Sequence, residues 1–173
     1  IKELAVRLGA DARKTVAIPY NITADSFPPP GDLAAFRRRS REAVVARHGL
    51  DPARPLVVSL NRLHPFKGIA YLVDAMPHLR RRDLRAQLLI VGPSRSTPRF
   101  GDYGDYLARR AAAHGVADDV LLTGGIPHHD AIQYLAAADV AVVPSVAESF
   151  SRVVVEAAAV GTPAVVTRTT GVS

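Results

Sequence analysis

The 173-residue sequence contains no cysteine and no tryptophan, and what it lacks narrows the classes of protein to which it can belong. Without cysteine, the chain can form neither disulfides nor thiolate metal sites. It has no apolar run near the ~20 residues that a membrane-spanning helix needs. Gly-x-Gly-x-x-Gly and Walker sequences are also absent, which argues against a dinucleotide dehydrogenase and a P-loop enzyme.

Aromatic residues are scarce, at 6%, and none is interleaved with a basic run. This argues against a platform for single-stranded nucleic acid, so we expect no nucleic-acid partner. The net charge is nevertheless +6. An anionic membrane surface or an anionic small substrate would suit this charge, but we favour a plain arginine-rich composition as its cause.

No secretory leader is recognisable, because the chain opens Ile1-Lys2-Glu3 with neither a methionine nor an apolar segment. This start indicates a fragment, and together with the lack of cysteine it favours a cytoplasmic location. The length suits one domain with a sizeable core and a short extension.

The first 30 residues are expected to form that extension. Apolar residues at helical spacing predict a helix that ends at Gly9, and Lys14–Pro19 is expected to be a short strand. Three consecutive prolines at 28–30 can continue neither a helix nor a central strand, which indicates a stiff linker.

From Gly31 onward, helical segments alternate with apolar runs typical of buried strands. Such alternation predicts an α/β fold with a Rossmann-like, doubly wound parallel sheet covered on both faces. We expect strands at 56–60, 87–92, 120–124, 139–144 and 164–167, and helices at 31–49, 68–82, 102–114, 128–138 and from Ser149 or Ser151 to Gly161.

Three details of this prediction concern individual segments. Pro77 is expected to kink or interrupt its helix, and 94–102 is expected to be a long polar loop. A doubly wound domain usually has six strands in the order 3-2-1-4-5-6, and only five are found. The sixth is therefore expected to be absent or supplied elsewhere, leaving an aggregation-prone edge near Val165 and Val166.

The usual strand order also predicts where a ligand binds. Open α/β sheets bind ligands beyond the carboxyl ends of the strands where the order reverses, here between the first and fourth strands. The loop after the first strand carries Arg62 and Lys67, followed by Gly68 at a helix start. Two cations and a helix N-terminus suit a diphosphate; the alternative is two surface cations beside a turn.

The loop after the fourth strand and the following helix carry two glutamates, Glu148 and Glu156. A single carboxylate can accept hydrogen bonds from both hydroxyls of a ribose diol. The alternative, two helix-surface glutamates, is less attractive for Glu156, whose helix is nearly free of charge. A separation of eight residues does not suit a retaining glycosidase, whose carboxyl groups lie about 5 Å apart.

The spacing Glu148-x7-Glu156 resembles that of retaining GT-B glycosyltransferases of family 4. The surrounding segments 148–150, 155–157 and 161–163 are also similar to that family, except that Ser151 stands where it usually has glycine. The resemblance covers residues 15–173. It implies that residues 1–30 are the tail of an N-terminal domain and a hinge, and that 31–173 form a nucleotide-sugar-binding domain, incomplete at its C-terminus.

The resemblance implies a role for each site residue. Arg62 and Lys67 would hold the donor diphosphate, Glu156 the ribose, and Glu148, the catalytic candidate, the transferred sugar, where its charge can stabilise the anomeric cation. Gly125 and Ile126 would contact the base, although a tight turn explains Gly125 equally well. The donor-binding candidates are Arg62, Lys67, Gly68, Gly125, Ile126, Glu148, Ser149, Phe150, Ser151 and Glu156.

We expect no cofactor and no metal, because none of the six histidines has a partner at metal-ligand spacing. The expected partners are a nucleotide-sugar donor, an acceptor that is a sugar, lipid or small molecule, and an N-terminal domain of the same chain. An arginine cluster, Arg37, Arg38, Arg39 and Arg41, would suit a peripheral membrane or acceptor contact, but we favour a solvated helix face.

Without its N-terminal domain, the segment is expected to bind donor and to transfer little or no sugar. Two alternatives to a hexosyltransferase remain open. One is a GT-B-like sugar-nucleotide epimerase or phosphorylase, and the other is a non-catalytic nucleotide-binding module. The residues do not specify the base, the sugar or the acceptor.

Overall fold

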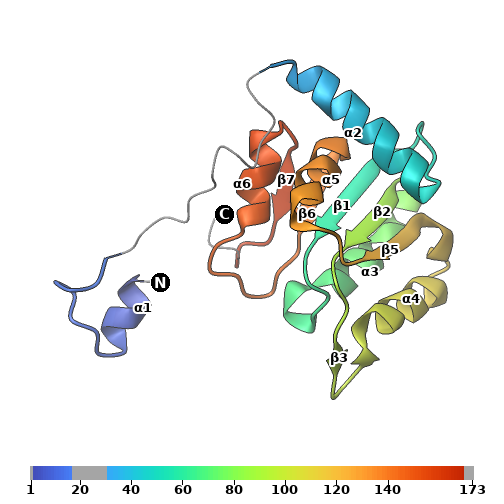
Figure 1. Cartoon of the computed structure of the whole chain (residues 1–173). Coiled ribbons are helices and arrows are strands. Elements are labelled where there is room, and N and C mark those ends of the chain that lie inside the picture. Colours follow the sequence, from blue (N-terminus) through green and yellow to red (C-terminus); the bar gives the residue numbers. More distant parts are fainter. Residues whose placement is uncertain (1, 17–30, 170–173) are drawn as a thin grey trace.

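A computed structural model describes residues 2–16 and 31–169 of the chain (Figure 1). Helix α1 (Lys2–Arg7) opens the first of these ranges. The strand expected at Lys14–Pro19 is wrong for Lys14–Val16, which form a turn and irregular backbone. The rest of that segment, the proline-rich hinge and residues 170–173 lie outside the described residues.

Five parallel strands form the central sheet, in the order β5-β2-β1-β6-β7. They are β1 (Leu56–Leu60), β2 (Gln87–Val91), β5 (Val120–Gly124), β6 (Val140–Val143) and β7 (Ala164–Val166). Counted along the chain, this is the order 3-2-1-4-5, so the predicted doubly wound, Rossmann-like α/β fold is confirmed. The strand order reverses between β1 and β6.

Helices cover both faces of this sheet (Figure 1). Helices α2 (Leu33–His48), α5 (Ala131–Ala137) and α6 (Arg152–Ala159) share one apolar core with the sheet, and α3 (Ile69–Arg80) and α4 (Tyr103–Ala113) share the other. Neighbouring residues of β1 serve different faces, since Val58 belongs to the first core and Val57 to the second. Within the described ranges, no helix is both long and apolar enough to cross a membrane.

The structure departs from the expected elements in three segments. Helix α3 runs through Pro77, so the expected interruption is wrong there; Pro77 lies in the last turn and lacks the N–H that would donate to the carbonyl of Val73. The 3₁₀ turn His128–Asp130 precedes α5, which begins only at Ala131. Finally, the expected loop 94–102 contains an antiparallel hairpin of β3 (Ser96–Thr97) and β4 (Gly101–Asp102).

Strand β7 lies at the edge of the sheet as expected. Among the described residues it pairs with β6 alone, and Val165 is 58% exposed. The predicted unpaired apolar edge is therefore present in this part of the chain.

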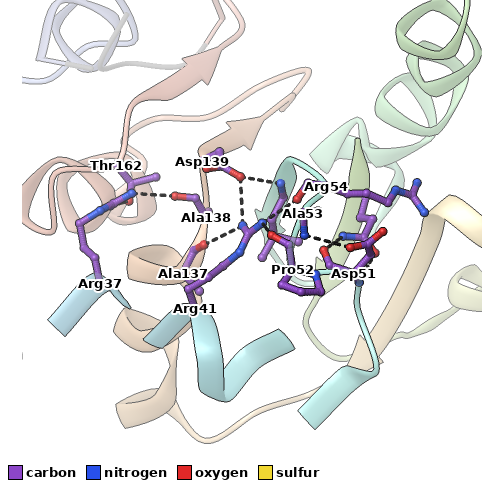
Figure 2. Close-up of polar contacts among 12 residues, drawn as sticks. Arg37, Arg41, Asp51, Pro52, Ala53, Arg54, Ala137, Ala138, Asp139 and Thr162 are labelled. Carbon is purple, nitrogen blue, oxygen red and sulfur yellow. Dashed lines mark hydrogen bonds and ion pairs between the residues drawn. The ribbon is translucent and has the colours of Figure 1, made fainter. Parts of the chain in front are cut away.

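Arg37 of α2 connects this helix to the ends of two others (Figure 2). Its guanidinium donates to the carbonyls of Val160 and Ala138, each at 2.9 Å, and to the Thr162 hydroxyl. These carbonyls end α6 and α5, where the backbone has no intrahelical donor and carries partial negative charge. Arg37 therefore satisfies two helix C-termini at once.

Arg41 makes a similar connection one turn further along α2 (Figure 2). It donates to the carbonyls of Ala137 and Arg54, at 3.2 and 2.6 Å, and pairs with Asp139 at 3.0 Å. A solvated face is thus the wrong interpretation for Arg37 and Arg41, whose charges are used against backbone carbonyls. The expectation holds for exposed Arg38 and Arg39.

An ion pair joins α3 to α4 on the opposite face. Arg110 donates to both oxygens of Asp74, at 2.5 and 2.6 Å, and His114 lies 2.9 Å from the same carboxylate. The hydrogen bonds from Arg110 hold the pKa of Asp74 below its usual value of 3.8. Because the folded pKa is lowered, this contact adds stability above pH 3.8 and loses it as the pH falls further.

We predict that Asp74→Asn destabilises the protein by about 1 kcal/mol at pH 7, a typical value for a partly exposed ion pair. The difference from wild type should be smaller at pH 3 than at pH 7, because the Asp74 carboxylate is then largely protonated in the unfolded chain, whereas its ion pair lowers its pKa in the folded protein. Urea denaturation at both pH values measures this. The exposed Asp118→Asn is the control and should cost little at either pH. If Asp74→Asn loses as much unfolding free energy at pH 3 as at pH 7, the stabilising role of the ion pair between Asp74 and Arg110 would be contradicted.

Candidate functional site

A pocket of about 370 Å³ opens at the carboxyl edge of the sheet, at the predicted position beyond β1 and β6. Its volume lies in the range of about 300–1,000 Å³ typical of small-molecule sites. Six of the ten predicted donor-binding residues line it: Arg62, Lys67, Ile126, Glu148, Phe150 and Ser151. The structure thus brings together residues from three separate loops, at 62–67, 126 and 148–151.

Four predicted site residues do not line this pocket. Gly68 lies against the backbone of Pro144, Gly125 lies beside Pro93, and Ser149 is exposed. Glu156 is buried, 7% exposed, and its carboxylate has no hydrogen-bond partner among the described residues. The donor-binding roles of these four residues stay predictions.

The pocket also includes residues that the sequence analysis missed, and most of them end a strand or begin a helix. Asn61 follows β1; it is 9% exposed and donates its side-chain amide to Ser59 Oγ at 3.1 Å. The position of these missed residues at the carboxyl edge of the sheet is the signal that could have identified them from the sequence. They are Leu60, Asn61, Val91, Gly92, Pro93, Pro127, Ala131, Arg152 and Val153.

The loop after β1 is shaped by the 3₁₀ turn Pro65–Lys67. His64 caps this turn by accepting the backbone N–H of Phe66 at its Nδ1, over 3.3 Å. The Phe66 carbonyl in turn accepts the N–H of Val146 at 2.9 Å, which ties this loop to the one after β6. Lys67, at the end of the turn, is thereby held at the boundary between the two loops.

The two opposite charges predicted for the site form an ion pair with each other. Lys67 Nζ donates to Glu148 Oε2, and the side chains are only 23% and 16% exposed. Arg62 is exposed, and its guanidinium has no partner in the part of the chain that the structure describes. Without a ligand, Glu148 therefore neutralises Lys67 while Arg62 stays available to an anion.

The loop that carries Glu148 is fastened to the chain after β7. The buried carbonyl of Ser145 accepts the hydroxyls of Thr167 and Thr169, the latter at 2.8 Å. The N–H of Glu148 lies 3.4 Å from the carbonyl of Thr169. The position of Glu148 thus depends on the segment that follows β7.

Helix α6 begins at the pocket, with Ser151, Arg152 and Val153 among the lining residues. Ser151 occupies the N-cap position, as one of the two expected caps, but its hydroxyl makes no capping hydrogen bond. Its backbone lies in the extended region at φ −99°, and the buried side chain does not reach the first turn. A helix N-terminus carries partial positive charge, which favours an anion at this end of the pocket.

Two glycines allow the loops around the pocket to approach each other. At Gly92, with φ 146°, a Cβ would lie 1.8 Å from the carbonyl oxygen of Asn61. At Gly68, with φ 65°, a Cβ would lie 1.9 Å from the carbonyl oxygen of Pro144. Any larger residue would push the ends of neighbouring strands apart, so these glycines set the width of the site.

Metal ligation has no evident place here. Among the described residues, no three His, Cys, Asp or Glu side chains are grouped to hold an ion. His129 pairs with Asp130 at 3.1 Å on the surface, where it is 82% exposed. The expectation that the protein uses no metal and no cofactor stays a prediction.

A doubly wound sheet with a cationic pocket at its switch point defines a Rossmann-like α/β domain, in which this edge binds phosphate-bearing ligands. Comparison with known proteins identifies the family within that class. The profile of the family described as "Glycosyl transferases group 1" matches residues 40–173, and the chain belongs to this family. The predicted resemblance to GT-B glycosyltransferases is thereby confirmed.

Individual relatives support the same assignment. The D-inositol 3-phosphate glycosyltransferase of Segniliparus rotundus is 35% identical over 85% of this chain and 32% of its own length. The GDP-mannose-dependent alpha-(1-6)-phosphatidylinositol monomannoside mannosyltransferase of Mycolicibacterium smegmatis is 38% identical over 89% of this chain and 38% of its own. The chain therefore spans about a third of the length of these relatives.

The fold has close counterparts among solved structures. Sucrose-phosphate synthase from Thermosynechococcus elongatus aligns with a TM-score of 0.74 and 29% identity, over 99% of this chain and 40% of that one. This likeness confirms the predicted α/β fold class and shows that a GT-B glycosyltransferase contains the same sheet and helices.

We predict that Gly68→Ala destabilises the protein by about 3 kcal/mol or more. A left-handed backbone costs an alanine about 1–2 kcal/mol, and the contact with Pro144 adds a clash of about 1–3 kcal/mol. Gly115→Ala is a matched control, because Gly115 has φ 67° but nothing within 4 Å of a Cβ. Urea denaturation of both variants separates the two costs. Equal losses would show that the close approach at Gly68 does not hold the loops together.

Proposed function

We propose that the chain binds a nucleotide-diphosphate sugar, as the donor-binding part of a retaining, family 4 glycosyltransferase that transfers a hexosyl group. The observation that carries this proposal is the pocket at the strand-order reversal, where Arg62, Lys67, Glu148 and the start of α6 meet. Membership of a glycosyltransferase family favours a transferase over an epimerase or a non-catalytic module. Acceptor binding would require a further domain, with residues 1–30 as tail and hinge.

The diphosphate fits the cationic side of the pocket. Arg62 offers planar, paired N–H donors, and Lys67 offers a compact positive charge. The N-terminus of α6 adds partial positive charge on the same pocket. That a relative is named for its dependence on GDP-mannose supports a nucleotide-diphosphate donor.

Glu148 is the catalytic candidate because it lines the pocket and contacts Lys67. A diphosphate bound to Lys67 would compete with Glu148 for that cation and release the carboxylate towards the sugar. A negative charge there stabilises the positive charge that develops on the anomeric carbon in the transition state. Glu156, buried on α6 without a partner in the described part, is the proposed acceptor of the ribose hydroxyls.

The first test of this proposal concerns the diphosphate. Arg62→Ala and Lys67→Ala should each weaken nucleoside diphosphate binding by about 1.5–3 kcal/mol, the scale of a hydrogen bond to a charged group. Binding of the nucleoside without phosphate should hardly change. The base is first chosen by a thermal-shift screen of the full-length protein with UDP-, GDP- and ADP-sugars, because a bound ligand raises the melting temperature.

Titration calorimetry with the nucleoside and its diphosphate then measures the affinities. Arg38→Ala serves as the control for a lost positive charge, since Arg38 is exposed on α2 and away from the pocket. Equal losses for nucleoside and diphosphate, or an equal loss in Arg38→Ala, would refute the diphosphate site.

The second test separates the two glutamates. Glu156→Gln should lower nucleotide affinity and raise KM, because the ribose is present in donor, product and free nucleotide alike. Glu148→Gln should lower kcat in the full-length enzyme and bind free nucleoside diphosphate at least as tightly, because Lys67 loses its competing partner. Calorimetry and steady-state kinetics give both quantities, and circular dichroism checks the fold.

The reverse pattern, in which Glu148→Gln loses nucleotide affinity and Glu156→Gln keeps it, would exchange the two roles. Unchanged transfer rates in both variants would place the reaction elsewhere. Either result leaves the family assignment standing, since that rests on the sequence match over residues 40–173.

A further inference from the structure

Asn61 is a buried amide in the wall of the pocket at the carboxyl edge, and the contacts proposed so far give it no role. It follows β1 directly and is only 9% exposed. Its N–H donates to the carbonyl of Val91 at 2.9 Å, which continues the pairing of β1 with β2 beyond the strands. The sheet therefore fixes the main chain of Asn61 beside the pocket.

The protein uses only part of the hydrogen-bonding capacity of the Asn61 amide. One of its N–H groups donates to Ser59 Oγ at 3.1 Å, and Ser59 is fully buried. An amide has a second N–H and a carbonyl oxygen with two lone pairs. Neither this second N–H nor the oxygen Oδ1 has a hydrogen-bond partner within the ranges 2–16 and 31–169. Asn61 thus keeps one donor and one acceptor free.

Another buried amide, Gln87 at the start of β2, has partners on both sides. It is 6% exposed, its Nε2 donates to the carbonyl of Asp51, and its Oε1 accepts the N–H of Asp51, each at 2.9 Å. Gln87 does not line the pocket. Because buried polar groups are normally satisfied in this way, the free donor and acceptor of Asn61 point to a ligand as their partner.

The free oxygen of Asn61 is accessible from the pocket. Among the described residues, the side-chain atoms that are both enclosed and unpaired are the hydroxyls of Ser40 and Ser145. Oδ1 of Asn61 has no partner and is not enclosed like these two hydroxyls, and the residue lines the pocket. A ligand in the pocket would therefore meet the free half of this amide.

One donor beside one acceptor suits a hydroxyl group better than a phosphate. A hydroxyl can accept the free N–H and donate to Oδ1, whereas phosphate oxygens only accept and would repel Oδ1. Arg62, the proposed diphosphate ligand, is the next residue, and consecutive Cα atoms are only about 3.8 Å apart. In a nucleotide-diphosphate sugar, the transferred sugar is bonded directly to the diphosphate, while the base lies beyond the ribose.

We infer that Asn61 binds a hydroxyl group of the transferred sugar and that Ser59 positions the amide for this contact. The inference rests on the proposed function, which places the diphosphate at Arg62 and the sugar at Glu148. A sugar that lacks this hydroxyl would leave the buried amide unpaired, which is costly. Asn61 would thereby help to determine which sugar the site accepts.

The experiment uses the full-length protein, the nucleotide sugar that the thermal-shift screen selects, and the nucleoside diphosphate of the same base. Asn61→Ala should weaken binding of the nucleotide sugar about tenfold, the scale of one or two neutral hydrogen bonds. Its affinity for the nucleoside diphosphate should change less than about twofold, because that ligand has no transferred sugar. Titration calorimetry without acceptor measures both affinities.

Analogues of the nucleotide sugar that each lack one sugar hydroxyl identify the group that Asn61 contacts. Wild type should bind one of these analogues about tenfold more weakly than the parent compound, again the scale of one or two hydrogen bonds. Asn61→Ala should bind that analogue and the parent equally well. Such non-additivity is expected when the two deleted groups interact with each other.

Two variants serve as comparisons. Ser59→Ala leaves the amide of Asn61 in place but removes the hydroxyl that orients it, so it should weaken nucleotide-sugar binding less than Asn61→Ala and spare the nucleoside diphosphate. Gln87→Ala deletes a buried amide outside the pocket. It should lower the melting temperature and leave both affinities within about twofold of wild type.

Equal binding of the nucleotide sugar by wild type and Asn61→Ala would overturn the inference and leave the donor site untouched. The same conclusion follows if Asn61→Ala loses as much affinity for the nucleoside diphosphate as for the nucleotide sugar, or if wild type binds every deoxy analogue as tightly as the parent. In contrast, a wild-type protein that binds none of the nucleoside diphosphates and none of their sugars would refute the proposed function itself.

Discussion

The site depends on the close approach of backbone to backbone at two glycines. The carbonyl of Asn61 occupies the space of a Cβ at Gly92, and the carbonyl of Pro144 does so at Gly68. The first contact brings the ends of β1 and β2 together, and the second sets the start of α3 against the end of β6. Because no side chain stands between the backbones at these two contacts, the loops lie close together. The side chains of Arg62, Lys67 and Glu148 can therefore reach one pocket.

Several arginines of the chain use their positive charge inside the fold. Arg37 and Arg41 bind carbonyls that end α5 and α6, and Arg110 joins α4 to α3. A guanidinium suits this work, since it offers five donors in one plane and stays charged when half-buried. A net charge of +6 therefore says little about external partners, and the cations proposed to bind the ligand, Arg62 and Lys67, lie at the carboxyl edge.

The sequence predicted the sheet because each strand is a largely apolar run, and strand order then followed from the rules of doubly wound folds. It also predicted the place of the pocket, because topology alone selects the loops after β1 and β6. It could not show the contact of Arg37 with Val160, or of Lys67 with Glu148, which join residues 123 and 81 positions apart. Such pairs depend on how helices lie on the sheet. Ser151 has the extended backbone usual for an N-cap, and yet its hydroxyl makes no capping hydrogen bond, which no residue pattern could show.

The attachment of Glu148 to the segment after β7 makes that segment a mechanical link. Thr167 and Thr169 hold the carbonyl of Ser145, and the carbonyl of Thr169 faces the N–H of Glu148. A displacement of the chain at Thr169 would thus also displace the loop of Glu148, because hydrogen bonds connect the two directly. A restraint on the chain beyond Thr169 would therefore also restrict where the Glu148 carboxylate can lie.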